Sequence, residues 1–135
     1  MRLEDDHYCF ACGSLNDIGL KLKFDFCEER KTISTEFTPQ KVHQGFKGIV
    51  HGGIIGLILD ECMVNIAWKL GILAVSAEYT IRLARPAAIN KKLIFFAKLT
   101  SERGKLLIIE GKCEDEAGKV IASSSSKCIK MQNDK

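Results

Sequence analysis

The sequence lacks an uninterrupted apolar run long enough to cross a membrane. Its longest apolar segment, residues 54–75, contains Asp60, Glu61, Asn65 and Lys69, and such side chains are costly near the middle of a lipid span. The N-terminal residues MRLEDDHYC are acidic and contain no apolar core of the kind that secretory signals carry. We therefore expect a cytoplasmic protein with no membrane partner.

A strong excess of positive charge is also absent. The chain has 20 Lys and Arg residues against 17 Asp and Glu residues, a net charge of +3. Nucleic-acid-binding domains usually concentrate more basic charge on one face, so we expect no nucleic-acid partner. The 135 residues show no internal repeat and no linker, and 46% of them are hydrophobic. Residues 1–135 are therefore expected to form a single domain.

A second Cys-x-x-Cys pair is missing. The chain has six cysteines, of which only Cys9 and Cys12 have this spacing. Zinc normally takes four ligands, so a site begun by these two cysteines and His7 would need completion by another subunit. We expect instead that residues 1–18 form an N-terminal segment in which reduced cysteines pack a small turn, with no bound metal.

Strand and helix patterns divide the rest of the chain. Residues 51–70 predict one long helix that is apolar on almost every side and is closed by Gly71. Such a helix must be buried, and strands joined by short turns form antiparallel sheets. The order of elements predicts an α+β hotdog fold, a curved antiparallel sheet of about six strands wrapped around one central helix. The strands are predicted at residues 19–26, 31–37, 75–83, 92–99, 105–113 and 119–131.

Two carboxylates interrupt the helix pattern, and helical geometry separates them. Gly53 and Gly56 share a face with Asp60 on its N-terminal side, which predicts an open, glycine-lined channel in front of that carboxylate. Glu61 lies about 100° further round the helix, on the face of Asn65 and Lys69. We expect Glu61 to belong to a solvated or interface stripe.

The tripeptide His51-Gly52-Gly53 precedes the helix, with no Ser, Thr or Asp as a cap. A helix N-terminus presents unpaired N–H groups and a partial positive charge, which together suit an external oxygen such as a substrate carbonyl. Asp60, about two turns further on, could then act as nucleophile or as general base for water. The alternatives are glycines that merely form a turn and an aspartate with a structural hydrogen bond.

The segment VHGGIIGLILDE resembles the HGG-x6-D/E signature of hotdog acyl-CoA thioesterases, particularly the PaaI-like, phenylacetate-pathway type. The segments AEYTIRLARPA and DEAGKVIASSSSKCI resemble further parts of that family, and the resemblance covers residues 8–131. It implies hydrolysis of an acyl-CoA thioester to a free acid and coenzyme A, with no cofactor beyond the coenzyme A of the substrate. It also implies a homodimer or homotetramer with active sites between subunits.

The resemblance assigns roles by position. Asp60 corresponds to the catalytic carboxylate, Gly52 to the glycine whose N–H polarises the thioester carbonyl, and His51 to the histidine that shapes the site. Five further residues are expected to bind the substrate: Gly53, Val50, Gln44, Arg85 and Arg82. The two arginines lie in a stretch with no acid, which suits the phosphates of coenzyme A.

The chain departs from the family at one position. Many relatives carry Asn or Gln six residues before the motif histidine, where this chain has Gly45. His43 and Gln44 are adjacent and could supply the missing polar group. Two other functions remain as alternatives, namely a non-catalytic acyl-CoA-binding module and a hydratase or dehydratase. The last would need an acid nearer the helix start, where the chain has Leu57.

Overall fold

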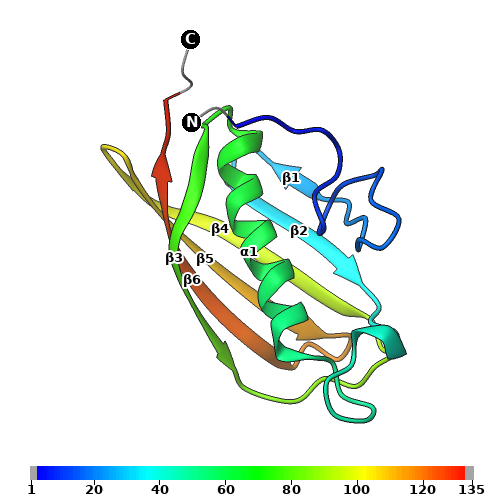
Figure 1. Cartoon of the computed structure of the whole chain (residues 1–135). Coiled ribbons are helices and arrows are strands. Elements are labelled where there is room, and N and C mark those ends of the chain that lie inside the picture. The colour runs from blue at the N-terminus through cyan, green and yellow to red at the C-terminus, as the bar shows by residue number, and fades with distance from the viewer. Residues whose placement is uncertain (1–2, 133–135) are drawn as a thin grey trace.

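The computed structural model describes residues 3–132 and shows one long helix packed against a curved antiparallel sheet of six strands (Figure 1). The strand order in the sheet is β1-β2-β4-β5-β6-β3. This arrangement confirms the predicted hotdog fold. In chain order the elements are β1 (Asp25–Cys27), β2 (Thr32–Phe37), the short 3-10 helix η1 (Lys41–His43), α1 (Gly52–Lys69), β3 (Ala74–Leu83), β4 (Leu93–Arg103), β5 (Leu106–Asp115) and β6 (Val120–Lys130).

Helix α1 lies across the concave side of the sheet and contacts β2, β3, β4, β5 and β6 (Figure 1). Its side chains are apolar on nearly every side, so the sheet must curve to enclose them. Within the described part of the chain, no helix is long and apolar enough to span a membrane. The largest fully buried side chains of this core are Ile33, Ile58, Leu59, Met63, Ile66, Leu93, Phe95, Leu107 and Ile109.

The C-terminal end of α1 is closed as the sequence predicts. Gly71 adopts a left-handed conformation with φ +78. The N–H of Ile72 donates to the carbonyl of Ala67 at 2.8 Å, and the N–H of Gly71 donates to that of Trp68 at 3.0 Å. These two bonds form a Schellman motif, which satisfies carbonyls left free by the last turn and directs the chain into β3.

The first strand is shorter than predicted. Alternation predicts a strand over residues 19–26, but the pairing with β2 begins only at β1. The N–H groups of Leu20 and Leu22 donate instead to the carbonyls of Phe10 and Ala11, each at 2.9 Å. Leu22 is buried as the alternation requires, but its backbone partner is the N-terminal segment and not the sheet.

A β-bulge in β3 decides which side chains face the helix. The register with β6 shifts between Ser76 and Glu78, so the alternation restarts one residue later. Unbroken alternation from Val75 to Leu83 would put Ser76 on the outer face of the sheet. With the bulge, Ser76 and Tyr79 both lie on the side of α1, and Tyr79 is paired with the buried Ser126.

Substitution of Gly71 tests how α1 is terminated. We expect Gly71→Ala to lower the free energy of unfolding by about 1 kcal/mol, because a left-handed backbone strains any residue with a Cβ. Apart from Gly71 itself and its two chain neighbours, nothing lies within 4 Å of the added Cβ, so the loss would come from the backbone alone. Asn tolerates this conformation, so Gly71→Asn is the control and should lose less in urea-induced unfolding. Equal stability of the Ala and Asn variants would contradict this explanation.

Candidate active site

Asp60 is held by β3 across the interface between helix and sheet. The Ser76 hydroxyl donates to Asp60 Oδ1 at 2.7 Å, and both residues are half-buried. The bulge in β3 is what turns Ser76 toward the helix. Sequence reasoning missed Ser76, because the alternation of β3 gives no sign that its phase changes at that point.

The surroundings of Asp60 shift its protonation equilibrium. Burial raises the pKa of the Asp60 carboxyl above its ordinary value, the hydrogen bond from Ser76 lowers it, and the charge of Glu61 raises it, with burial the largest effect. Burial disfavours the charged form because it removes water from the carboxylate, whereas the Ser76 hydroxyl favours that form. Asp60 is therefore a carboxylate of increased basicity, as a general base requires.

The start of α1 is capped by the motif histidine. Gly53 N–H donates to His51 Nδ1 at 2.8 Å, so the imidazole accepts through Nδ1, as only a ring unprotonated at that nitrogen does. The prediction of an uncapped helix is therefore wrong for the N–H of Gly53. A Cβ on Gly53 would lie 3.0 Å from this same nitrogen, so glycine allows the ring to approach closely.

The N–H of Gly52 remains available. Among the described residues, this N–H donates no hydrogen bond. The open channel predicted along Gly53 and Gly56 is filled, because the His51 ring lies against Gly53 and the β3 side chain of Ile81 lies against Gly56. A Cβ on Gly52 would lie 2.7 Å from Leu83 Cδ1, and one on the buried Gly56 would lie 3.2 Å from Ile81 Cδ1. These glycines let α1 approach β3 closely.

The loop before α1 forms one wall of the helix start. Gln44 Oε1 accepts from the N–H of Gly48 at 3.1 Å, which leaves the amide nitrogen of Gln44 without an acceptor among residues 3–132. The N–H of His51 donates to the carbonyl of His43 at 2.9 Å, and a Cβ on Gly45 would lie 3.5 Å from His51. Gly45, where many relatives carry an amide, is thus adjacent to the motif histidine.

The remaining predicted substrate-binding residues lie in different places. Val50 is buried, and its N–H donates to the carbonyl of Ala87 at 2.9 Å, which ties the helix start to the loop after β3. Arg85 lies in that loop and donates from Nη1 to the carbonyl of Val120 at 3.2 Å. Arg82 lies on the outer face of β3, in a hollow with Ser123, on the side of the sheet opposite Asp60.

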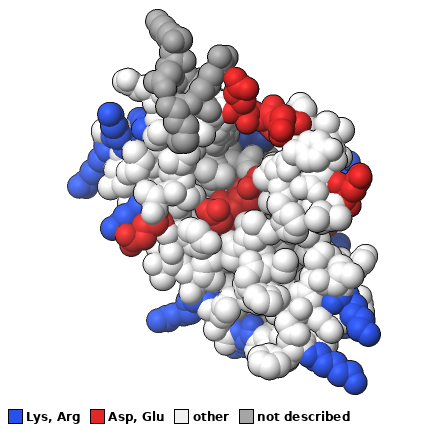
Figure 2. Space-filling model, in the orientation of Figure 1, with Lys and Arg blue, Asp and Glu red and all other residues white. Residues whose placement is uncertain are grey.

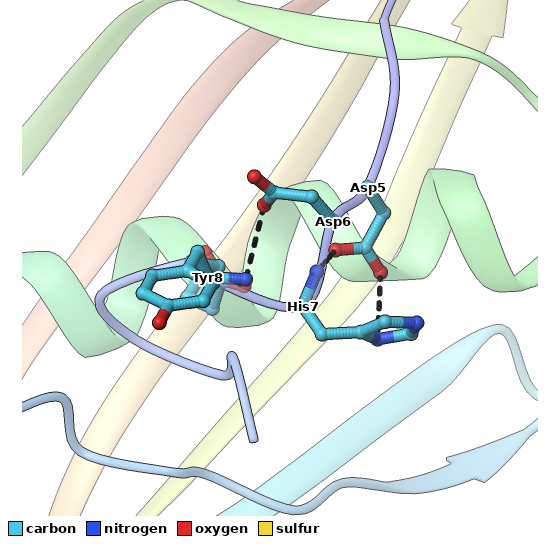
Figure 3. A network of polar contacts seen from close by, with 6 residues as sticks. Asp5, Asp6, His7 and Tyr8 are labelled. Carbon is cyan, nitrogen blue, oxygen red and sulfur yellow. Dashed lines mark hydrogen bonds and ion pairs between the residues drawn. The ribbon is translucent and has the colours of Figure 1, made fainter. Parts of the chain in front are cut away.

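Glu61 is covered by the N-terminal segment, although a solvated or interface stripe was expected. Asn65 Nδ2 donates to Glu61 Oε1 at 3.0 Å, which agrees with the predicted shared face. Cys9 Sγ donates to the same oxygen at 3.6 Å. His7 takes no part in this contact: its Nδ1 lies 3.7 Å from Asp5 Oδ2, and Asp5 also accepts from the His7 N–H (Figure 3).

The raised pKa of Asp60 predicts a pH-dependent effect of its removal. A carboxyl with a raised folded-state pKa destabilises the fold at neutral pH, and the penalty disappears as the pH falls through that raised value toward the ordinary value of about 3.9. We expect Asp60→Asn to melt at a higher temperature than the wild type near neutral pH. The difference should narrow as the pH is lowered to about 4. A melting temperature below that of the wild type near neutral pH would contradict the direction of the pKa shift.

Several solved structures share this fold. A crystallised thioesterase superfamily protein superimposes with a TM-score of 0.85 at 22% identity, covering 91% of this chain and 60% of that protein, so the chain spans three fifths of its length. A hypothetical thioesterase from Streptococcus pneumoniae TIGR4, solved with coenzyme A, gives a TM-score of 0.77 at 10% identity, covering 84% and 88% of the two chains. The E. coli PaaI protein from the phenylacetic acid degradation operon gives a TM-score of 0.76 at 16% identity, covering 82% of this chain and 83% of that protein. A search among curated proteins found no match.

A family model supplies the classification. The thioesterase superfamily model matches residues 47–122, which is more than half of the chain. The match contains the histidine-glycine-glycine tripeptide at the start of α1, Asp60 within the helix and Ser76 on β3. The chain therefore belongs to the thioesterase superfamily.

Proposed function

We propose that this protein hydrolyses an acyl-CoA thioester to a free acid and coenzyme A, with Asp60 as its catalytic carboxylate. The observation that carries the proposal is the Asp60 carboxylate itself, half-buried on α1 and held by Ser76 at 2.7 Å. Two structural neighbours support the substrate class, since one was solved with coenzyme A and another, from Streptococcus mutans UA159, with acetyl-CoA.

The N–H of Gly52 is the proposed donor to the thioester carbonyl. It has no acceptor among the described residues and lies at the positive end of the helix dipole. A donor at this place stabilises the negative charge that develops on the carbonyl oxygen during attack. Gly53 would act indirectly, because its N–H holds His51 in place at 2.8 Å.

The separation of these two groups along α1 argues for a second copy of the chain. Gly52 and Asp60 are eight residues apart on one helix, which corresponds to about 12 Å along the axis. A general base must lie within about 3 Å of the proton it removes, or act through one water. A carbonyl bound at Gly52 is therefore out of direct reach of Asp60 of the same chain. We propose that Gly52 of one subunit acts together with Asp60 of another.

Strand β3 is the proposed surface for that second copy. It is an edge strand of ten residues, and long unpaired edges are ready to pair with another strand. Tyr79 and Leu83 on its helix side are 46% and 54% exposed. The centre of the face on which α1 lies is largely uncharged apart from a few acidic side chains (Figure 2), as the middle of a subunit interface often is. This supports a homodimer or a larger homo-oligomer.

Ser76 is the proposed positioning residue for Asp60. Two further structures of the Streptococcus pneumoniae protein carry a substituted aspartate and a substituted threonine, at positions 16 residues apart. Asp60 and Ser76 have the same separation of 16. Arg85 is the better candidate for a coenzyme A phosphate, because it lies in the loop that the Val50 N–H ties to the helix start through Ala87. Arg82 would reach a substrate only from the outer face of the sheet.

Removal of the Asp60 charge tests the catalytic assignment. Asp60→Asn keeps the shape of the side chain and an oxygen that accepts from Ser76, but cannot act as base or nucleophile. We expect free-thiol release from a panel of acyl-CoA substrates to fall by at least about 10²-fold. The control is Glu110→Gln, which removes an exposed carboxylate from β5 and should leave turnover unchanged. Full turnover by Asp60→Asn would remove Asp60 from the mechanism, and binding without turnover by the wild type would indicate a binding module.

Ser76 gives a separate prediction in the pH profile. Because its hydroxyl stabilises the charged carboxylate, Ser76→Ala should raise the pKa of Asp60 further. The acid limb of kcat/KM, which reports the protonation of the free enzyme, should therefore move to higher pH. Ser76→Thr keeps the donor and should restore the wild-type limb. An unchanged acid limb in Ser76→Ala would mean that Asp60 is not the titrating group.

A further inference from the structure

The N-terminal segment brings metal-binding side chains together against α1. In residues 3–132, one donor atom each of Cys9, Cys12 and Glu61 lie within 4.8 Å of one another. Cys9 and Glu61 are 52 positions apart in the chain, so no spacing rule in the sequence connects them. From this geometry we infer that Cys9, Cys12 and Glu61 form a zinc site that clamps the N-terminal segment to the central helix.

The distances fit a tetrahedral ion. Zinc binds sulfur at about 2.3 Å and carboxylate oxygen at about 2.1 Å, which puts a sulfur and an oxygen ligand about 3.6 Å apart. Cys9 Sγ and Glu61 Oε1 are separated by 3.6 Å. The same geometry requires two sulfurs about 3.8 Å apart, which lies inside the 4.8 Å limit of the cluster. An ion therefore enters with side-chain shifts of no more than about an ångström.

The backbone holds the two cysteines in a rigid turn. The N–H of Gly13 donates to the carbonyl of Cys9 at 2.8 Å, and the N–H of Leu15 donates to that of His7 at 2.9 Å. Gly13 is buried, and a Cβ there would lie 2.4 Å from the nitrogen and 2.6 Å from the oxygen of Cys9. Only glycine fits directly after the second cysteine. The backbone of this turn therefore holds Cys9 and Cys12 in a defined position relative to each other.

Glu61 is oriented in the way that metal-binding carboxylates are. Asn65 Nδ2 donates to Glu61 Oε1 at 3.0 Å and to the Glu61 carbonyl at 2.8 Å. Hydrogen bonds to a metal-binding side chain fix its orientation and increase the affinity of the site for the metal. One turn of α1 thus supplies both the ligand and its support.

The chemistry of the thiols favours a metal over a disulfide-exchange centre. Redox Cys-x-x-Cys pairs lie in electropositive surroundings that favour the thiolate, whereas the charged group beside Cys9 and Cys12 is the carboxylate of Glu61, within 4.8 Å of both sulfurs. A divalent cation supplies the positive charge that a cluster of two thiols and a carboxylate lacks. Binding would replace both thiol protons, releasing two protons for each zinc ion bound.

Three protein ligands leave one position of the tetrahedron for water. Cys9, Cys12 and Glu61 are each half-buried, so an ion and that water can reach the site from solvent. The clamp would fasten the N-terminal segment one residue away from Asp60. The site is independent of the proposed hydrolysis, and its test needs no substrate.

Metal binding by the purified, reduced full chain is the direct test. We expect one zinc per chain by elemental analysis. With cobalt as the probe, we expect thiolate-to-metal charge-transfer bands and tetrahedral visible bands. Zinc should raise the melting temperature, and a chelator should reverse the rise. A reduced wild-type chain that binds neither metal, or that binds cobalt without thiolate bands, would overturn the inference.

Variants locate the ion. Cys12→Ser should abolish stoichiometric zinc and the thiolate bands, whereas Cys27→Ser, which removes a half-buried cysteine outside the cluster, should keep both. Asn65→Ala leaves all three ligands in place and should weaken zinc binding about 10- to 100-fold in a chelator competition. Glu61→Gln should keep the thiolate bands but bind more weakly. Circular dichroism checks that each variant is folded, and unchanged zinc binding by folded Cys12→Ser would overturn the assignment.

Discussion

The enclosure of α1 is the constraint on which the rest of the structure depends. The helix is apolar on nearly every side, so it is stable only with the sheet curved around it. That enclosure removes water from any polar side chain on the helix, and such a side chain then needs a partner from another element. Asp60 and Glu61 are the two carboxylates of the helix, and each has such a partner. Asp60 takes a hydroxyl from β3, and Glu61 takes contacts from Asn65 and the N-terminal segment.

The two partners differ in what they do to a charge. A hydroxyl that donates to a carboxylate stabilises the ionised form, while incomplete burial keeps that form reactive. Asp60 therefore remains a base whose strength is set by opposing influences. A thiol beside a carboxylate is in the opposite situation, since its own ionisation would place two negative charges together. Adjacent acids on one helix thus have different chemistry because different segments cover them.

The sequence predicts the parts of this arrangement that follow from periodicity. Residues 51–70 are apolar enough to require a central helix, and Gly71 ends it through a backbone conformation that favours glycine. The features missed depend on contacts between distant segments or on a local change of phase. The bulge after Ser76 reverses which face of the sheet the first residues of β3 point to, and no glycine or proline marks it. Residues 19–26 alternate like a strand, but their partner is the N-terminal segment, which hydrophobic alternation cannot distinguish from a sheet neighbour.

The proposed clamp and the proposed catalytic carboxylate can be adjacent without interfering. The metal-free cluster has two neutral thiols and one carboxylate, and therefore one net negative charge. With zinc bound, two thiolates and the carboxylate around a divalent ion give the same net charge. The net charge of the cluster next to Asp60 is therefore the same with and without zinc. Zinc would alter the position and rigidity of the N-terminal segment while leaving the basicity of Asp60 to burial and to Ser76.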